Sequence, residues 1–217
     1  MGKTAVVLGS ARSGTSMVAG ILDILGVNMN SAPNFGAENP KGCFEDKEIV
    51  DLTYQWCEGS LSDEEAISKF IQWVNKRTGD PVWGFKSTWT HYHIDKLLPL
   101  LHNPHLVFVV RDLKDNVFAH YYQQIRDNKD KLAELENLPM SEAQKTLYDI
   151  SFLLKVYCRY QKEYPTFMIH FDQLHSDPVK VATDLAWFLG IPIYRVKDSI
   201  IAIQEFVVKN HSYWKGL

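Results

Sequence analysis

A glycine-rich turn between a short apolar run and a helical pattern constrains the fold of this chain more than any other segment. The run Ala5 to Leu8 is typical of a β-strand, and apolar residues recur at helical spacing between Thr15 and Gly26. Glycine permits positive φ in the turn, and the first N–H groups of a helix have no partner within it. A strand, turn and helix in this order can therefore bind an anion such as phosphate.

The residues of this loop differ from those of nucleoside-triphosphate enzymes at an important position. The loop consists of Gly9, Ser10, Ala11, Arg12, Ser13, Gly14, Thr15 and Ser16. Thr15 stands where the motif G-x-x-x-x-G-K-[ST] has a lysine, and Arg12 supplies a forked cation within the loop instead. Because that lysine reaches the β and γ phosphates, its absence argues against ATP hydrolysis. The alternative interpretation is a turn whose glycines serve only its geometry.

Chain length, charge and cysteine content indicate one domain over residues 1–217 and limit the partners. A chain of 217 residues is long enough for one α/β domain and short for two, and its net charge of -3 predicts neither nucleic-acid nor membrane binding. Asp23 interrupts the longest apolar stretch near the N-terminus, so we expect no signal peptide or membrane span. Cys43, Cys57 and Cys158 lack C-x-x-C spacing, which suits a cytoplasmic protein with free thiols. The oligomeric state stays open.

Strand and helix patterns alternate along the chain and predict parallel βαβ units. After the first strand we expect strands at 82–86, 106–110 and 167–171. Helices are expected over 15–26, 46–58, 62–74, 92–102, 113–127, 141–163, 178–189 and 196–208. Such units place helices on both faces of a parallel sheet. The expected fold is therefore α/β, with a three-layer parallel sheet flanked by helices.

The loop resembles the 5′-phosphosulfate loop of sulfotransferases that use 3′-phosphoadenosine 5′-phosphosulfate (PAPS). In that family a lysine or arginine precedes Ser-Gly-Thr-[ST], which matches Arg12 to Ser16. The resemblance implies a P-loop-like fold, PAPS as co-substrate and 3′-phosphoadenosine 5′-phosphate (PAP) as product. It also implies a small-molecule or glycan acceptor that carries a hydroxyl group, and no metal.

Two later residues match the nucleotide-binding positions of that family. Lys86 matches a lysine at the end of the next core strand, and a solvated lysine is the alternative. Arg111 matches the residue that pairs with the 3′-phosphate, and an ion pair with a neighbouring aspartate is the alternative. Ala119 stands where the family has a serine as second 3′-phosphate ligand. His120 or a backbone amide is expected to replace it, or the nucleotide binds more weakly.

Sulfuryl transfer requires the acceptor oxygen, the sulfur and the leaving phosphate oxygen to lie in line, and the charge that grows on the leaving oxygen must be stabilised. Arg12, Lys86 and the amides of residues 13–16 can supply this stabilisation if the first two strands are neighbours. We therefore expect Arg12 and Lys86 to act in the chemical step.

The general base is not identified by a single match. Many relatives carry a histidine two residues after the strand-end lysine, and Thr88 occupies that position here. The candidates are Glu45, His91 and His93. Glu45 is favoured because residues 39–45 resemble a segment near the acceptor pocket of bacterial relatives, some of which place a glutamate base there. The two histidines lack a nearby carboxylate at ligand spacing, so we expect no metal site, and exposed histidines at a helix start are the alternative.

Two other functions stay open from the sequence. A small P-loop nucleotide or metabolite kinase would share the fold, but it requires Mg²⁺ and a cation on the γ-phosphate. A nucleotide-binding regulatory module without turnover is consistent with Ala119 and Thr88. Six tryptophans and ten tyrosines, among them Trp56, Trp83 and Trp89, would suit an aromatic or glycan acceptor and equally an ordinary core.

Overall fold

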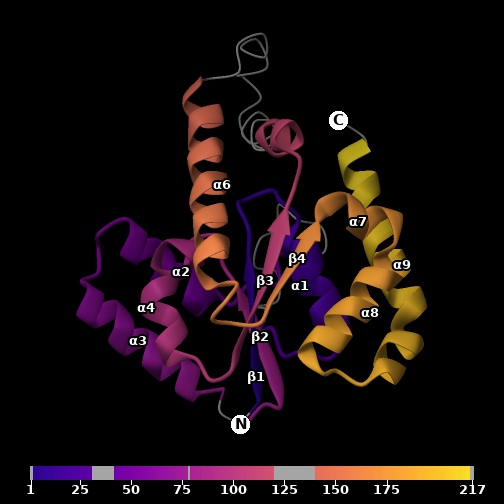
Figure 1. Cartoon of the computed structure of the whole chain (residues 1–217), viewed down its shortest axis with the longest axis horizontal. Helices are drawn as coiled ribbons and strands as arrows, with labels where there is room; N and C mark the ends of the chain where they lie inside the picture. The colour runs from indigo at the N-terminus through magenta and orange to yellow at the C-terminus, as the bar shows by residue number, and fades with distance from the viewer. Residues whose placement is uncertain (1, 31–41, 78, 120–139, 216–217) are drawn as a thin grey trace.

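The computed structural model describes residues 2–30, 42–77, 79–119 and 140–215 (Figure 1). Its elements are β1 (Lys3–Leu8), α1 (Thr15–Ile24), α2 (Lys47–Cys57), α3 (Asp63–Asn75), β2 (Val82–Lys86), η1 (Thr90–His93), α4 (Ile94–Leu97), η2 (Leu98–Leu100), β3 (Pro104–Val110), α6 (Met140–Tyr160), β4 (Thr166–His170), α7 (Phe171–Ser176), α8 (Pro178–Leu189) and α9 (Ile193–Lys215). A further helix is described over residues 113–119. The expected alternation of strands and helices is confirmed.

The described strands form one parallel sheet in the order β2-β1-β3-β4. In this register Val7 lies beside Lys86, and Leu8 lies beside Phe108. Because β1 has β2 on one side and β3 on the other, the loop after β1 begins between the ends of its two neighbours. This topology brings the ends of β1, β2 and β3 to one edge of the sheet.

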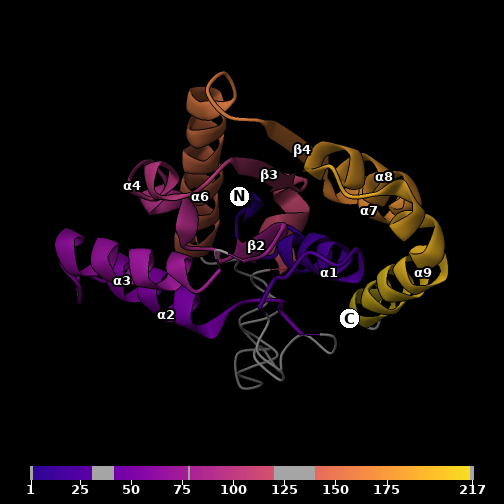
Figure 2. The same ribbon diagram turned by 90° about the horizontal axis from the view of Figure 1, so that it is seen from below.

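Residues of β1 alternate between the two faces of the sheet, and both faces are covered. Val6 and Leu8 belong to a buried cluster with α2, α3, α4 and α6, whereas Ala5 and Val7 belong to a cluster with α1, α8 and α9. Figures 1 and 2 show these two groups of helices on opposite sides of the strands. The continuous apolar runs of β1 and β3 follow from this arrangement, since the central strands of a sheet covered on both faces are buried on both sides, whereas the edge strand β4 is mostly half-buried. The expected three-layer fold is confirmed.

Helix starts follow the capping residues in the sequence. Ser62 and Glu65 form a capping box at α3, and the Asp46 side chain accepts a hydrogen bond from the backbone N–H of Glu48 at the start of α2. Asp177 caps α8, whose first residue is proline, and Gly190 ends it with a φ of 71°. These four boundaries could be predicted because each depends on a few adjacent residues.

The structure departs from the expected helices in three main places. The expected helix at 92–102 is wrong in form, because the segment consists of η1, α4 and η2. Pro99 lies in η2 and has no N–H, so it cannot donate a hydrogen bond within a continuous α-helix. Helix α7 begins directly after β4 and was not expected, and α9 begins at Ile193 rather than Val196. The helix expected at 113–127 lies outside the described residues beyond 119.

Candidate active site

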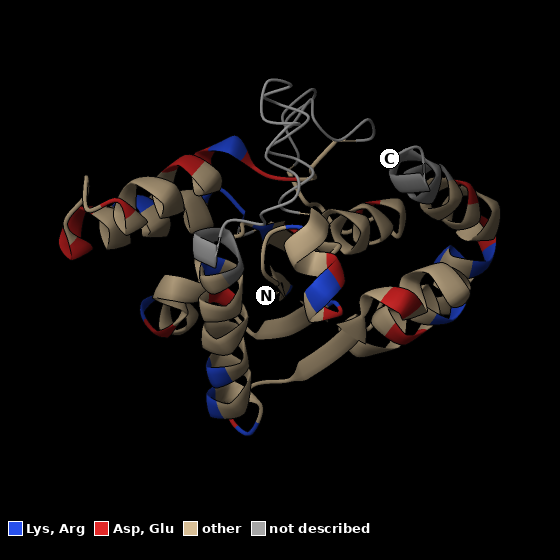
Figure 3. Ribbon diagram, turned by 90° about the horizontal axis from the view of Figure 1, so that it is seen from above, with Lys and Arg blue, Asp and Glu red and all other residues tan. Residues whose placement is uncertain are grey.

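The loop between β1 and α1 occupies the edge of the sheet where the strands end, which Figure 3 views from above. Gly14 caps α1 with a φ of 101°, and no side chain caps this helix. Arg12 also has a positive φ, of 65°. A left-handed backbone at both positions turns the chain sharply from strand to helix, so the uncapped helix start faces the strand ends.

Close packing requires glycine at both loop positions. A Cβ atom at Gly9 would lie 2.6 Å from the Ser13 Oγ atom and 2.9 Å from the Val109 carbonyl oxygen. A Cβ atom at Gly14 would lie 2.4 Å from the ring of Phe171. These distances are shorter than non-bonded contacts allow, so the loop backbone lies directly against β3 and the start of α7.

Lys86 connects the loop with the segment that precedes α2. Its side chain is 4% exposed, and its Nζ atom donates to Ser16 Oγ at 3.1 Å and lies 2.7 Å from Glu45 Oε1. The parallel register with β1 sets the position of Lys86, because Val7 is its partner and the loop begins two residues later. The structure therefore brings together a cation, a carboxylate and the end of the loop, each from a different part of the chain.

Arg111 follows β3 and contacts the same loop from the other side. Its Nη1 atom donates to the Arg12 carbonyl oxygen at 3.1 Å, and its guanidinium lies 4.3 Å from the ring centroid of Phe171. Burial lowers the pKa of Arg111, while the charges of nearby aspartates raise it. An arginine stays protonated at neutral pH in such surroundings, so Arg111 adds a positive charge beside the loop.

Several buried polar atoms near the loop have no hydrogen-bond partner among the described residues. They include Ser13 Oγ, Arg111 Nε and Asn116 Oδ1. Asn116 is fully buried, and its Nδ2 atom donates to Ser10 Oγ at 2.9 Å. Buried polar groups are normally satisfied, and the hydroxyl of Ser13 and the Nε–H of Arg111 are donors that a phosphate oxygen can accept from. The described residues thus fit a phosphorylated ligand at the loop.

The structure places His91 in the interior rather than at the loop. Its side chain is fully buried, and its Nε2 atom lies 2.6 Å from Asp149 Oδ1 on α6. The same carboxylate oxygen accepts a hydrogen bond from the Tyr92 hydroxyl at 2.8 Å, and burial together with this bond raises the pKa of Tyr92. Neither contact involves Lys86 or Glu45. The alternative of an exposed histidine is therefore wrong for His91.

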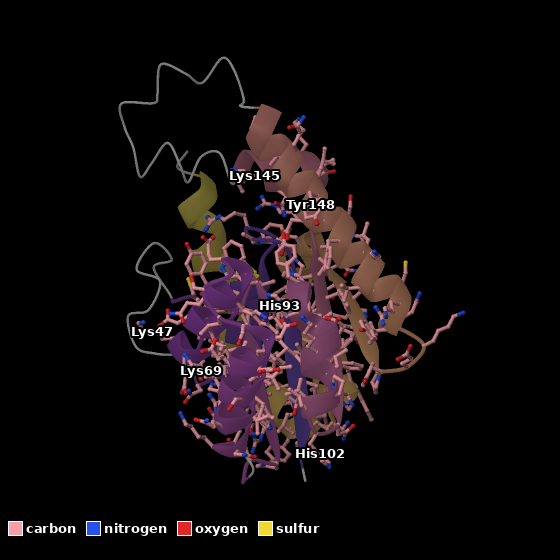
Figure 4. The ribbon with its side chains drawn as sticks, turned by 90° about the vertical axis from the view of Figure 1, so that its left-hand side faces the viewer. Lys47, Lys69, His93, His102, Lys145 and Tyr148 are labelled. Carbon is pink, nitrogen blue, oxygen red and sulfur yellow. The ribbon has the colours of Figure 1, made fainter. Side chains whose placement is uncertain are left out.

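His93 packs against α2. Its ring stacks on Trp56 with centroids 4.0 Å apart, and its Nε2 atom lies 3.2 Å from Cys57 Sγ. Burial lowers the pKa of His93 and raises the pKa of the Cys57 thiol to about 11. Figure 4 shows His93 on the side of the molecule formed by α2 and α3, below Tyr148 of α6. The thiol is therefore protonated at neutral pH, and this pair is no activated nucleophile.

Of the two positions expected near the 3′-phosphate, Ala119 and His120, the structure describes only the first. Ala119, which replaces the expected serine, is buried. His120, its proposed substitute, lies outside the described residues. Asn116 and Phe171 are site residues that the sequence interpretation missed. Phe171 follows the carboxyl end of β4 directly, so the rule that parallel strand ends meet at one edge could have indicated it.

The part of the chain that the structure describes holds neither a metal cluster nor a membrane-spanning helix. There, no three His, Cys, Asp or Glu side chains lie together as a metal site would need. No described helix combines the length and the apolar character needed to cross a bilayer.

Comparison with known proteins identifies the family. A sequence profile described as "Sulfotransferase domain" matches residues 3–213. Comparison with curated proteins found no match. A sulfotransferase from Mycobacterium avium, STF9, has a similar structure with a TM-score of 0.59 at 14% identity, over 93% of this chain and 68% of that one. The sulfotransferase domain of the Synechococcus PCC 7002 olefin synthase gives a TM-score of 0.50 at 15% identity, over 97% and 87%. At these identities the two structures support the fold alone.

Proposed function

The chain belongs to the sulfotransferase domain family, and from this premise we propose that it transfers a sulfuryl group from PAPS to a hydroxyl group on a small-molecule or glycan acceptor. PAP is then the second product. The observation that carries the proposal is the position of Lys86, whose Nζ atom lies 3.1 Å from Ser16 Oγ at the loop and 2.7 Å from Glu45 Oε1. A cation at the phosphate loop and a carboxylate beside it are the groups that sulfuryl transfer needs.

The nucleotide is proposed to bind along the edge where the strands end. The loop residues Gly9 to Ser16, with the Arg12 side chain, hold the 5′-phosphosulfate through amides and charge. Arg111 pairs with the 3′-phosphate, which is supported by its contact with the Arg12 carbonyl and by its unpartnered Nε atom among the described residues. His120 completes the 3′-phosphate site in this proposal.

The chemical step is proposed to use Glu45, Lys86 and Arg12. The acceptor oxygen attacks the sulfur while the bond between sulfur and the 5′-phosphate oxygen breaks, and Glu45 takes the proton of the acceptor hydroxyl. Lys86 and Arg12 stabilise the charge that grows on the leaving oxygen. A general base contributes about 10²–10⁴-fold and a preorganised donor about 10²–10³-fold to the rate. His91 and His93 rank below Glu45, because their contacts are with Asp149, Trp56 and Cys57.

No step in this scheme calls for a metal ion, and Thr15, which carries no charge, occupies the place of the kinase lysine. We keep the cytoplasm as the proposed location, on the cysteine pattern of the sequence.

A direct test supplies the protein with PAPS labelled with ³⁵S and a panel of phenols, aliphatic alcohols and sugars, with EDTA present. We expect label to move to at least one acceptor with release of an equal amount of PAP, and the Glu45→Gln variant to be slower by about 10²-fold or more. If a parallel assay without EDTA shows phosphate transfer from ATP with Mg²⁺ and the PAPS assay shows no sulfuryl transfer, the protein is a kinase. If PAP binds but no acceptor is sulfated, the regulatory module is the better account.

A further inference from the structure

Asp46, the residue after Glu45, holds several elements together through one buried carboxylate. Its side chain is only 6% exposed. The carboxylate accepts hydrogen bonds from the backbone N–H of Glu48 at 2.8 Å, Asn30 Nδ2 at 2.6 Å, Trp73 Nε1 at 2.7 Å and Arg77 Nη2. These donors come from α2, from the segment after α1, from the last turn of α3 (Trp73) and from the residues just after α3 (Arg77). We call Asp46 with Asn30, Trp73 and Arg77 the Asp46 cluster.

The Asp46 cluster extends to the strand that carries Lys86. The Arg77 guanidinium lies over the rings of Trp73 and Trp83, 4.9 and 5.7 Å from their centroids. Trp83 is in β2, three residues before Lys86. The hydroxyl groups of Thr53 in α2 and Ser87 lie 2.8 Å apart, which joins α2 to the end of the same strand. The start of α2 and the end of β2 are therefore fixed relative to each other.

The residue before Glu45 is anchored on the opposite face of the sheet. Phe44 has a φ of 52°, and its ring meets that of Phe206 in α9 edge to face with centroids 5.6 Å apart. Phe44 thus packs on the face covered by α1 and α9, whereas Asp46 is buried on the face covered by α3. Glu45 lies between these two anchors, and its carboxylate points to Lys86.

We propose that Asp46 is a positioning residue that holds the backbone at Glu45 in the place where its carboxylate reaches Lys86. A helix cap alone does not explain this cluster, because asparagine or serine would cap α2 equally well and burial of a carboxylate is costly. The cost is offset here by four hydrogen bonds, of which the one from Arg77 is also an ion pair, and the result is a rigid segment. The inference rests on the proposed function, in which Glu45 is the general base.

The test is Asp46→Asn, which keeps the helix cap and removes the charge. We expect kcat to fall by about 10- to 100-fold, since displacement of a catalytic group by about 1 Å can cost that much. The affinity for PAP should change by less than about threefold, because the loop and Arg111 are untouched. Asp63→Asn is the matched control, as Asp63 accepts from Trp56 Nε1 at 2.8 Å and pairs with Lys96 at 2.7 Å on the surface. It should leave kcat unchanged.

A double-mutant cycle with Glu45→Gln separates positioning from a merely structural role. If Asp46 acts through Glu45, then Asp46→Asn lowers kcat in the wild-type background and lowers it no further in the Glu45→Gln background. An equal loss in both backgrounds, or no loss in the wild-type background, overturns the proposal. If Glu45→Gln alone retains full turnover, Glu45 is not the general base and the proposed role of Asp46 is also wrong. If Glu45→Gln lowers kcat and the losses of kcat in the two single variants add in the double variant, only the role of Asp46 is wrong.

Hydrogen exchange gives a readout that needs no acceptor. The peptide that contains residues 42–48 should exchange faster in Asp46→Asn than in Asp63→Asn, and equal exchange would contradict the inference. Should Asp46→Asn fail to fold, Asn30→Gly removes a single side-chain hydrogen bond from the Asp46 cluster, and glycine tolerates the φ of 47° at this position. We expect a smaller loss of kcat from Asn30→Gly, which again disappears in the Glu45→Gln background, and an additive loss would overturn the proposal.

Discussion

Replacing Arg111 by alanine should weaken PAP binding by about 10- to 150-fold. A hydrogen bond to a charged partner contributes about 1.5–3 kcal/mol, and each 1.4 kcal/mol is a factor of ten in Kd. The structure also predicts that Arg111→Ala is less stable without ligand, because the hydrogen bond from Nη1 to the Arg12 carbonyl oxygen and the contact of the guanidinium with the Phe171 ring are lost. The free energy of unfolding should fall by about 1–2 kcal/mol.

Titration calorimetry with PAP at 0.15 M salt measures the effect directly, and thermal unfolding checks it. At a PAP concentration of about 100 times the wild-type Kd, ligand stabilises the wild type by about 2.7 kcal/mol. A variant with a hundredfold weaker Kd would gain only about 0.4 kcal/mol at that concentration. Arg111→Lys should bind PAP with intermediate affinity, because lysine keeps the positive charge but cannot donate the paired hydrogen bonds of a guanidinium. Lys114→Met, at an exposed position three residues later, is the control. PAP affinity in Arg111→Ala equal to that of the control would refute the assignment.

Gly9→Ala should destabilise the fold by about 1–3 kcal/mol and weaken PAP binding, because the new methyl group would lie 2.6 Å from two side-chain atoms of the loop; urea unfolding and calorimetry that both match the wild type would contradict this. Lys86→Met should lower kcat by about 10²–10³-fold, and Lys47→Met on the surface should not. A Lys86→Met enzyme within about threefold of the control would show that Lys86 does not stabilise the leaving group. Because burial raises the pKa of Cys57 to about 11, only about 0.1% of it is thiolate at pH 8, and alkylation by iodoacetamide should begin at the exposed Cys158. The rate at Cys57 should rise about tenfold per pH unit up to about pH 11, and mass spectrometry that finds equal labelling at pH 8 would contradict this.

The sheet and the loop could be predicted because their signals are local. Apolar runs such as residues 106–110, the capping box at Ser62 and the glycines at the turn each depend on adjacent residues. The prediction of a helix over 92–102 was wrong in form for an equally local reason, since Pro99 within it has no N–H to donate to a continuous α-helix. Helix α7 was missed because it follows β4 without any turn residue between them.

The contacts of the candidate site could not be predicted, because they join distant parts of the chain. The pairing of Lys86 with Glu45 depends on the parallel register of β1 and β2 and on the cluster that fixes the start of α2. His91 is buried against Asp149, which lies 58 residues later in the sequence. Trp56 and Trp83, which the sequence suited equally to an acceptor pocket and to an ordinary core, belong to the core on the α2 and α3 side.

We propose that the site formed by residues 9–16, Lys86 and Arg111 binds a nucleotide with phosphates at both the 3′ and 5′ positions. Thermal unfolding with PAP, with PAPS and with ATP plus Mg²⁺, each over a range of concentrations, tests this binding. The unfolding midpoint should rise with PAP and PAPS, and ATP with Mg²⁺ should have a much smaller effect. A rise with ATP and Mg²⁺ alone would contradict the proposal.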